Sequence, residues 1–152
     1  MPVIYVYHQI HLVNTLINIG LVEDHRLLRK SIKSMLESNS CFHVSMEADN
    51  GKEFIELLSP ATQPEIILLD IQMPVMNGFE TAAYLKEHYP AIKVIALSLF
   101  KNETSLLNML NLGAVAYITK NEEPEAFINT IMEVHNNGYS IKKDENMSNK
   151  VN

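Results

Sequence analysis

The stretch Glu65-Ile66-Ile67-Leu68-Leu69-Asp70 is an unbroken apolar run that ends in a single carboxylate. Continuous Ile and Leu without polar alternation predict a strand that is covered on both faces, as in parallel α/β sheets. The last residue, Asp70, then emerges at the carboxyl edge of the sheet, where open α/β folds bind their ligands. The sequence therefore predicts a functional carboxylate at this edge.

A second apolar run, Ile17–Val22, ends in the same way, in the acid pair Glu23-Asp24. If both runs are strands of one parallel sheet, three acids converge on one edge. Carboxylates that crowd together repel one another unless a cation lies among them, and oxygen ligands of this kind suit Mg²⁺. The two runs together indicate phosphate chemistry.

Strand and helix patterns alternate along the whole chain. We expect strands at 17–22, 41–48, 66–70, 93–97 and 114–119, and helices at 26–38, 54–58, 79–90, 106–112 and 124–137. Five strands alternating with five helices predict a doubly wound parallel α/β sheet with helices on both faces. Right-handed crossovers favour the flavodoxin-like strand order 2-1-3-4-5, which makes strands 1 and 3 neighbours and so brings Glu23, Asp24 and Asp70 together.

The composition is that of one globular domain. The chain has 152 residues, of which 47% are hydrophobic and 20% charged, and its net charge is −6. We divide it into an extension at 1–16 whose role the sequence does not reveal, a domain at 17–138, and a polar tail or truncated linker at 139–152. The acidic balance without a basic cluster argues against nucleic-acid binding by this chain alone. The single cysteine, Cys41, is compatible with a reducing compartment.

The uncharged N-terminal region resembles a membrane segment only superficially. The first twenty-two residues carry no Asp, Glu, Lys or Arg, but polar residues such as His8, Asn14 and Asn18 interrupt the apolar ones. A secretory signal begins with basic residues, and none is present here. We therefore expect no membrane association and a cytoplasmic location.

Five motifs together resemble the receiver domain of two-component response regulators. They are Leu21-Val22-Glu23-Asp24-His25, Leu68-Leu69-Asp70-Ile71-Gln72-Met73-Pro74, Asn77-Gly78, Val94-Ile95-Ala96-Leu97-Ser98 and Gly113-Ala114-Val115-Ala116-Tyr117-Ile118-Thr119-Lys120. The segment Asp24-His25-Arg26-Leu27-Leu28-Arg29 is similar to the start of the NarL/FixJ subfamily. The resemblance spans residues 18–138.

The resemblance implies a role for each matching residue. Asp70 corresponds to the phosphoacceptor, and Lys120 to the cation that pairs first with Asp70 and later with the phosphoryl group. Mg²⁺ would be held by Asp24, Asp70 and the main-chain carbonyl of Gln72, with Glu23 assisting. Ser98 corresponds to the hydroxyl that binds the phosphoryl group, and Tyr117 to the aromatic residue that moves with it.

The resemblance also implies a signalling function rather than an enzyme, with at most self-phosphorylation from small donors and self-dephosphorylation. The phosphoryl group would come from a sensor histidine kinase or a phosphotransfer protein. That partner is expected to dock on helix 26–38 through Arg26, Leu27 and Arg29. Phosphorylation would change the face formed by residues 101–112 and 115–119 and the last helix, through which the chain could form a homodimer. A DNA-binding output domain is usual in this subfamily and is missing from the chain.

Several alternatives stay open at the level of the sequence. Taken singly, Asp70 could cap the turn after its strand, Glu23-Asp24 could cap the following helix, and Lys120 could be solvated. The whole chain could be a docking module that accepts no phosphate. It could also be a phosphatase-type enzyme with an aspartyl nucleophile, although Gln72 stands where such enzymes carry a second acid. A flavin or nucleotide binder would need a phosphate-cradling loop in place of Glu23-Asp24.

Overall fold

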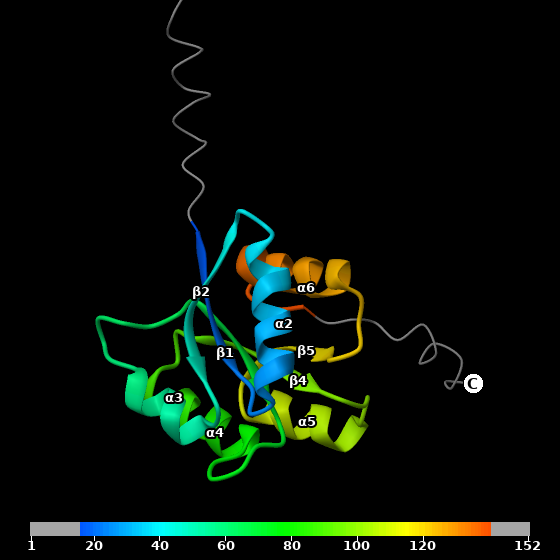
Figure 1. Ribbon diagram of the computed structural model, residues 1–152. Coiled ribbons are helices and arrows are strands. Elements are labelled where there is room, and N and C mark those ends of the chain that lie inside the picture. The colour runs from blue at the N-terminus through cyan, green and yellow to red at the C-terminus, as the bar shows by residue number, and fades with distance from the viewer. Residues whose placement is uncertain (1–15, 141–152) are drawn as a thin grey trace, which may run out of the picture.

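The computed structural model describes residues 16–140, so nearly all of the predicted extension (1–16) and most of the predicted tail (139–152) lie outside the described residues. Ten elements alternate between strand and helix (Figure 1). They are β1 (Ile17–Val22), α2 (Arg26–Glu37), β2 (Phe42–Ala48), α3 (Gly51–Leu57), β3 (Ile66–Asp70), α4 (Gly78–His88), β4 (Lys93–Ser98), α5 (Glu103–Asn111), β5 (Ala114–Thr119) and α6 (Pro124–Asn137).

The five strands form one parallel sheet in the order β2-β1-β3-β4-β5, as the sequence predicts. Val22, the last residue of β1, pairs with Leu69 of β3, and Asp70 pairs with Leu97 of β4. On the other side of β4, Ser98 pairs with Thr119 of β5. The register therefore ends β1, β3, β4 and β5 at the same level, so that the residues following each strand share one edge.

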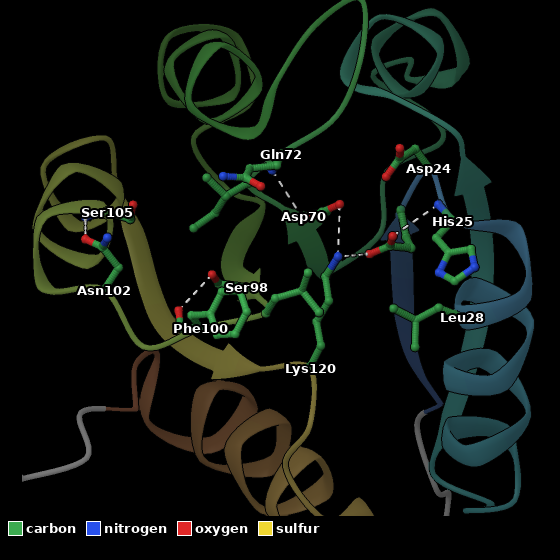
Figure 2. Close-up of a pocket in the computed structure, with 13 residues that line it drawn as sticks. Asp24, His25, Leu28, Asp70, Gln72, Ser98, Phe100, Asn102, Ser105 and Lys120 are labelled. Atoms are coloured by element: carbon green, nitrogen blue, oxygen red, sulfur yellow. Dashed lines mark hydrogen bonds and ion pairs between the residues drawn. The ribbon is translucent and has the colours of Figure 1, made fainter.

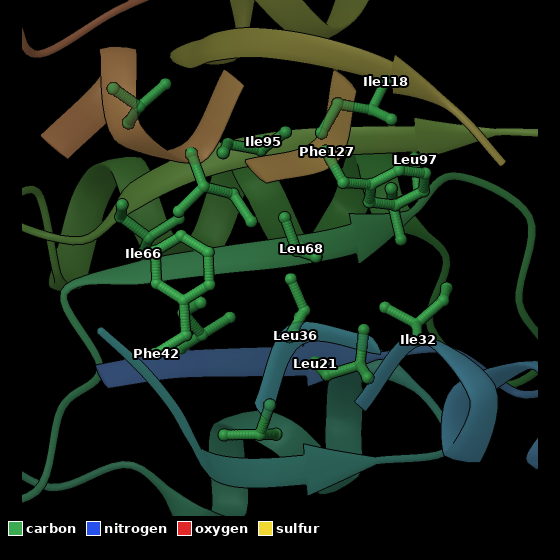
Figure 3. Close-up of a cluster of buried hydrophobic side chains, with 14 of the residues drawn as sticks. Leu21, Ile32, Leu36, Phe42, Ile66, Leu68, Ile95, Leu97, Ile118 and Phe127 are labelled. Carbon is green, nitrogen blue, oxygen red and sulfur yellow. The ribbon is translucent and has the colours of Figure 1, made fainter. Parts of the chain in front are cut away.

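The central strand β3 explains the two-layered core. Its five residues are all buried, and their side chains alternate between the two faces of the sheet. Ile66 and Leu68 belong to the cluster under α2 and α6, which Figure 3 shows, whereas Ile67 and Leu69 belong to the cluster under α3, α4 and α5. Because both faces of this strand are buried, every side chain along it is apolar up to Asp70, and the sequence is an unbroken apolar run.

Asparagine side chains begin three of the helices. Asn50, Asn77 and Asn102 each accept a hydrogen bond from a main-chain N–H in the first turn of α3, α4 and α5. The expected start of α3 at Phe54 is therefore too late, since Asn50 is the N-cap and Gly51 is the first helical residue. The predicted limits of α6 are confirmed: Pro124 opens the helix, and Gly138, with φ of 87°, ends it.

The chain continues in contact with the sheet for two residues beyond Gly138. The main-chain N–H of Ser140 donates to the carbonyl of Val115 in β5 at 3.0 Å, and the Ser140 hydroxyl donates to the Glu133 carboxylate. Ser140 is buried. These contacts direct the chain along β5, on the side of the sheet where α6 lies.

Candidate functional site

The acids of the β1 and β3 termini lie together at the carboxyl edge of the sheet. Glu23, Asp24 and Asp70 each offer an oxygen atom, and these three atoms lie within 4.8 Å of one another. Figure 2 shows the side chains around the pocket above this edge. The pocket measures about 240 Å³, and Gln72, Ser98, Leu99 and Lys120 are among the other residues that line it.

Lys120 lies between two of the acids rather than in solvent. Its Nζ is 2.6 Å from Oε2 of Glu23 and 3.0 Å from Oδ2 of Asp70, and its side chain is 8% exposed (Figure 2). Burial lowers the Lys120 pKa, but the ion pairs with Glu23 and Asp70 outweigh this effect and leave the pKa raised. Lys120 is therefore a fixed positive charge, and the solvated alternative is wrong.

Asp70 is a buried carboxyl whose negative charge is incompletely compensated. Burial and the neighbouring charge of Glu23 raise its pKa from 3.8 to about 6, although Lys120 and the hydrogen bond from the Gln72 N–H oppose the shift. The Gln72 N–H donates to Oδ1 at 3.2 Å, so Asp70 does cap the turn after β3. The capping and functional interpretations of Asp70 are therefore compatible.

Glu23 is fully buried and turns inward, whereas Asp24 is exposed. Oε1 of Glu23 accepts the main-chain N–H of His25, and Oε2 pairs with Lys120. The N-cap of α2 is His25, and no side-chain hydrogen bond caps this helix. The expectation that the acid pair caps α2 is therefore wrong, because Glu23 bonds the amide ahead of the helix instead of one within its first turn.

The residues present fit a hard divalent cation. Three carboxylates against one ammonium leave an excess of negative charge, and the charge of Glu23 adds to the effect of burial in raising the pKa of Asp70. Asp24 projects its carboxylate at the exposed rim, and Gln72 lies in the loop immediately after β3 (Figure 2). This all-oxygen donor set is of the kind that Mg²⁺ prefers.

Two hydroxyl side chains, one from β4 and one from β5, meet at one main-chain atom. The hydroxyls of Ser98 and Tyr117 each donate to the carbonyl oxygen of Phe100, both at 2.9 Å. The Phe100 and Leu99 side chains are 77% and 57% exposed, so the loop after β4 is held by these hydroxyls and not by burial of its apolar residues. The sequence gives no signal for this acceptor, because it belongs to the main chain.

One of the three residues expected to form the docking face on α2, Arg29, turns inward. Arg26 and Leu27 are exposed, with Leu27 at 73%, but the side chain of Arg29 is 11% exposed. The Arg29 guanidinium instead binds the Asp49 carboxylate and the main-chain carbonyl of Glu23. Sequence reasoning missed this inward role because Arg29 and Asp49 belong to different elements, twenty residues apart.

The comparisons with known proteins agree with this arrangement. The response regulator receiver domain family matches residues 19–132. The chain is 33% identical over 125 residues to the transcriptional regulatory protein DegU of Brevibacillus brevis, covering 82% of this chain and 52% of that protein. It is 34% identical over 111 residues to the nitrate/nitrite response regulator protein NarL of Escherichia coli K12, covering 73% and 51%. The chain thus spans about half the length of the curated relatives it matches.

A solved structure of another response regulator confirms the fold. The DNA-binding response regulator of the LuxR family from Staphylococcus aureus superposes with a TM-score of 0.72 at 28% identity, covering 78% of this chain and 98% of that one. Within residues 16–140, no helix combines the length and the apolar character that crossing a bilayer requires. The family match, the strand order and the acid pocket lead to one conclusion: the chain belongs to the response regulator receiver domain family.

Proposed function

We propose that Asp70 is the phosphoacceptor of a signalling switch. The observation that supports this most directly is the position of its carboxylate, which lies at a strand end, in a pocket, beside Lys120 and two further acids. One Asp70 oxygen attacks the phosphorus of a phosphohistidine, an O–P bond forms, and the P–N bond breaks. Its electron pair returns to the imidazole, and Asp70 becomes an acyl phosphate.

Asp24, Asp70 and the Gln72 carbonyl are the groups that we assign to a bound Mg²⁺, with Glu23 assisting from its inward position. When bound, the ion would supply positive charge that offsets the negative charge on the oxygens of the phosphoryl group during its transfer. Lys120 already pairs with Asp70, and after transfer its ammonium is placed to bind a phosphoryl oxygen instead. The acidic pocket thereby accepts an anionic group that it would otherwise repel.

Ser98 and Tyr117 are the residues that we expect to transmit the change. A phosphoryl oxygen on Asp70 competes for the Ser98 hydroxyl, which at present donates to the Phe100 carbonyl. Once Ser98 turns away, Tyr117 alone holds that carbonyl, and the loop before α5 is free to rearrange. A few charge-assisted bonds suffice, because about 1.4 kcal/mol changes a two-state ratio tenfold.

The partners of the switch follow from its faces. We assign the exposed Arg26 and Leu27 of α2 to docking of a sensor histidine kinase or phosphotransfer protein, and the α5–β5–α6 face to output, including a homodimer. The relatives are transcriptional regulators about twice as long as the matched region, which supports a DNA-binding output outside this chain. We assign the domain to residues 17–138 and the protein to the cytoplasm.

Acetyl phosphate with Mg²⁺ tests the proposal, with intact-protein mass as the readout. The wild-type chain is expected to gain one phosphate, Asp70→Asn none, and the wild type without Mg²⁺ far less. Glu56→Gln removes an exposed acid of α3 and serves as the control that keeps full incorporation. Equal incorporation by Asp70→Asn would overturn the assignment. No incorporation by the folded wild type would favour the docking module.

A further inference from the structure

Arg29 of α2 carries a nearly buried positive charge that the proposed phosphoryl transfer does not use. Its side chain is 11% exposed, and a buried guanidinium needs close partners to offset the loss of hydration. One nitrogen, Nη1, donates both to the main-chain carbonyl of Glu23 and to Oδ1 of Asp49, the residue after β2. Nε lies 3.7 Å from Oε1 of Glu47.

The contacts of Arg29 hold the turn that carries Asp24 from both sides. The guanidinium binds the carbonyl that precedes Asp24, in the peptide group joining it to Glu23. The main-chain N–H of Arg29 donates to the carbonyl of His25, the residue after Asp24, at 2.9 Å, as the first hydrogen bond of the helix. The residues on either side of Asp24 therefore each have their carbonyl bound by Arg29.

No side chain takes over this role from the start of the helix. The N-cap His25 makes no side-chain capping bond, and the first turn of α2 contains no acidic residue. On the strand side, the Glu23 N–H bonds the Ala48 carbonyl at 3.1 Å, which fixes the end of β1 but not the peptide beyond it. The guanidinium fixes the Glu23–Asp24 peptide and the Glu23 carboxylate fixes the Asp24–His25 peptide through the His25 N–H, so the direction of Asp24 depends on both.

We propose that Arg29 is a positioning residue that holds the Glu23-Asp24 pair in the geometry that binds the divalent cation. The proposal rests on the function proposed above and adds to it a residue that touches neither the cation nor the phosphoryl group. Asp49 completes this arrangement. Its carboxylate, in the residue after β2, holds the guanidinium against the end of β1. Groups that orient metal ligands in this way typically change metal affinity about 10–100-fold when removed.

The experiment measures Mn²⁺ binding to the unphosphorylated protein by electron paramagnetic resonance, since Mn²⁺ takes the same oxygen donors as Mg²⁺. Arg29→Met keeps the aliphatic stem and removes the guanidinium, and is expected to raise the Mn²⁺ dissociation constant about tenfold. Arg29→Lys, which keeps the positive charge but replaces the guanidinium by a single nitrogen, should be intermediate. The sign is diagnostic, because loss of a nearby positive charge would by itself tighten the binding of a cation.

Lys33→Met is the matched control. Lys33 lies one turn further along α2 and pairs with Glu47 at 2.7 Å, but it does not contact Glu23. The Lys33→Met substitution removes one positive charge from the same helix, as Arg29→Met does. We expect its Mn²⁺ dissociation constant to stay within twofold of the wild-type value. If Arg29→Met fails to fold, Asp49→Asn replaces it, because loss of that carboxylate frees the guanidinium. Since loss of a negative charge would by itself weaken cation binding, this variant is judged by hydrogen exchange at the His25 amide.

Amide hydrogen exchange provides a readout that involves neither metal nor phosphate. Loss of protection at the His25 amide, which now donates to Glu23, is expected in Arg29→Met and not in Lys33→Met. Unchanged exchange together with unchanged or tighter Mn²⁺ binding would overturn the positioning role. If Arg29→Met shows both the Mn²⁺ effect and the exchange effect but the wild-type protein accepts no phosphate, only the proposed function is overturned.

Discussion

At the scale of single residues, the burial of Asp70 makes the stability of the folded protein depend on pH. It is buried beside a second acid, so the folded protein holds its proton more tightly than the unfolded chain does, with a pKa of about 6 against 3.8. A carboxyl whose pKa is raised by folding stabilises the protein at low pH. That contribution is present below the unfolded pKa and disappears as the pH rises through about 6.

The stability of the metal-free protein should therefore fall with pH in a way that depends on Asp70. Between pH 5 and pH 8, the wild type is expected to lose about 1 kcal/mol of unfolding free energy relative to Asp70→Asn, which cannot ionise. Urea unfolding at the two pH values measures the difference. A wild type that gains stability relative to the variant over this interval would show that Lys120 compensates the carboxylate fully. Adding Mg²⁺ should reduce the loss.

At the scale of elements, the start of α4 is packed directly against the reactive strand end. The Asn77-Gly78 motif does two separate things there. Asn77 forms a capping box with Glu80, which fixes where the helix begins. Gly78 lets the helix approach the chain after β3, because a Cβ atom at this position would lie 2.3 Å from the main-chain oxygen of Asp70 and 2.7 Å from the Cα of Ile71. Both are main-chain atoms of a central strand and the residue after it, so the neighbour cannot simply rotate away.

Gly78→Ala is accordingly expected to move Asp70 rather than only to weaken the helix. We expect a loss of about 2 kcal/mol in unfolding free energy from overpacking. The rate of acetyl phosphate labelling should fall at least tenfold in the folded protein, because reactive groups tolerate little displacement.

Ala83→Gly is the matched control, since Ala83 is exposed in the same helix and its change costs about 1 kcal/mol through helix propensity alone. Its labelling rate should remain that of the wild type. If both variants label equally fast under conditions where both are folded, the close approach of Gly78 has no bearing on the site.

At the scale of the whole molecule, several exposed apolar residues lie on the face proposed for output. On α5, Leu107 is 59% and Leu110 40% exposed, and Phe100 of the preceding loop is 77% exposed. A groove of about 420 Å³ runs along this face, with Leu110, Tyr117 and Ser140 among the residues that line it. Both Tyr117 and the residue whose carbonyl it binds line this surface, so a change at Ser98 is expected to alter its shape.

Phosphorylation is expected to promote self-association through this face. With Mg²⁺ and beryllofluoride as the phosphoryl analogue, sedimentation should show a larger dimer fraction than in the untreated protein. Leu107→Glu should abolish the increase while leaving acetyl phosphate labelling intact. Leu57→Glu, at a residue of α3 that is 48% exposed near β2, at the opposite edge of the sheet from β5, is the control and should dimerise normally. Equal dimer loss in both variants would refute this interface.

Much of the architecture could be predicted from the sequence because it depends on local pattern. The apolar run before Asp70 predicts a strand buried on both faces, and Pro124 and Gly138 predict the limits of α6; all three are confirmed. The start of α3 was not predicted, because the helix begins at Gly51, after the N-cap Asn50 and ahead of the first large apolar residue. Strand order followed from the general rules for parallel crossovers, which hold whatever the side chains are.

By itself the sequence determined which acids occur and at which strand ends they stand, since hydrophobic periodicity decides where strands stop. Only the tertiary structure decided how those charges are shared: that Glu23 turns inward to Lys120 while Asp24 stays exposed, that Ser98 and Tyr117 meet at one carbonyl, and that Arg29 faces the end of β1 instead of a partner. The physical reason is that electrostatic and hydrogen-bond energies depend on distances of a few ångströms between residues far apart in the chain. Such distances exist only once the sheet has formed.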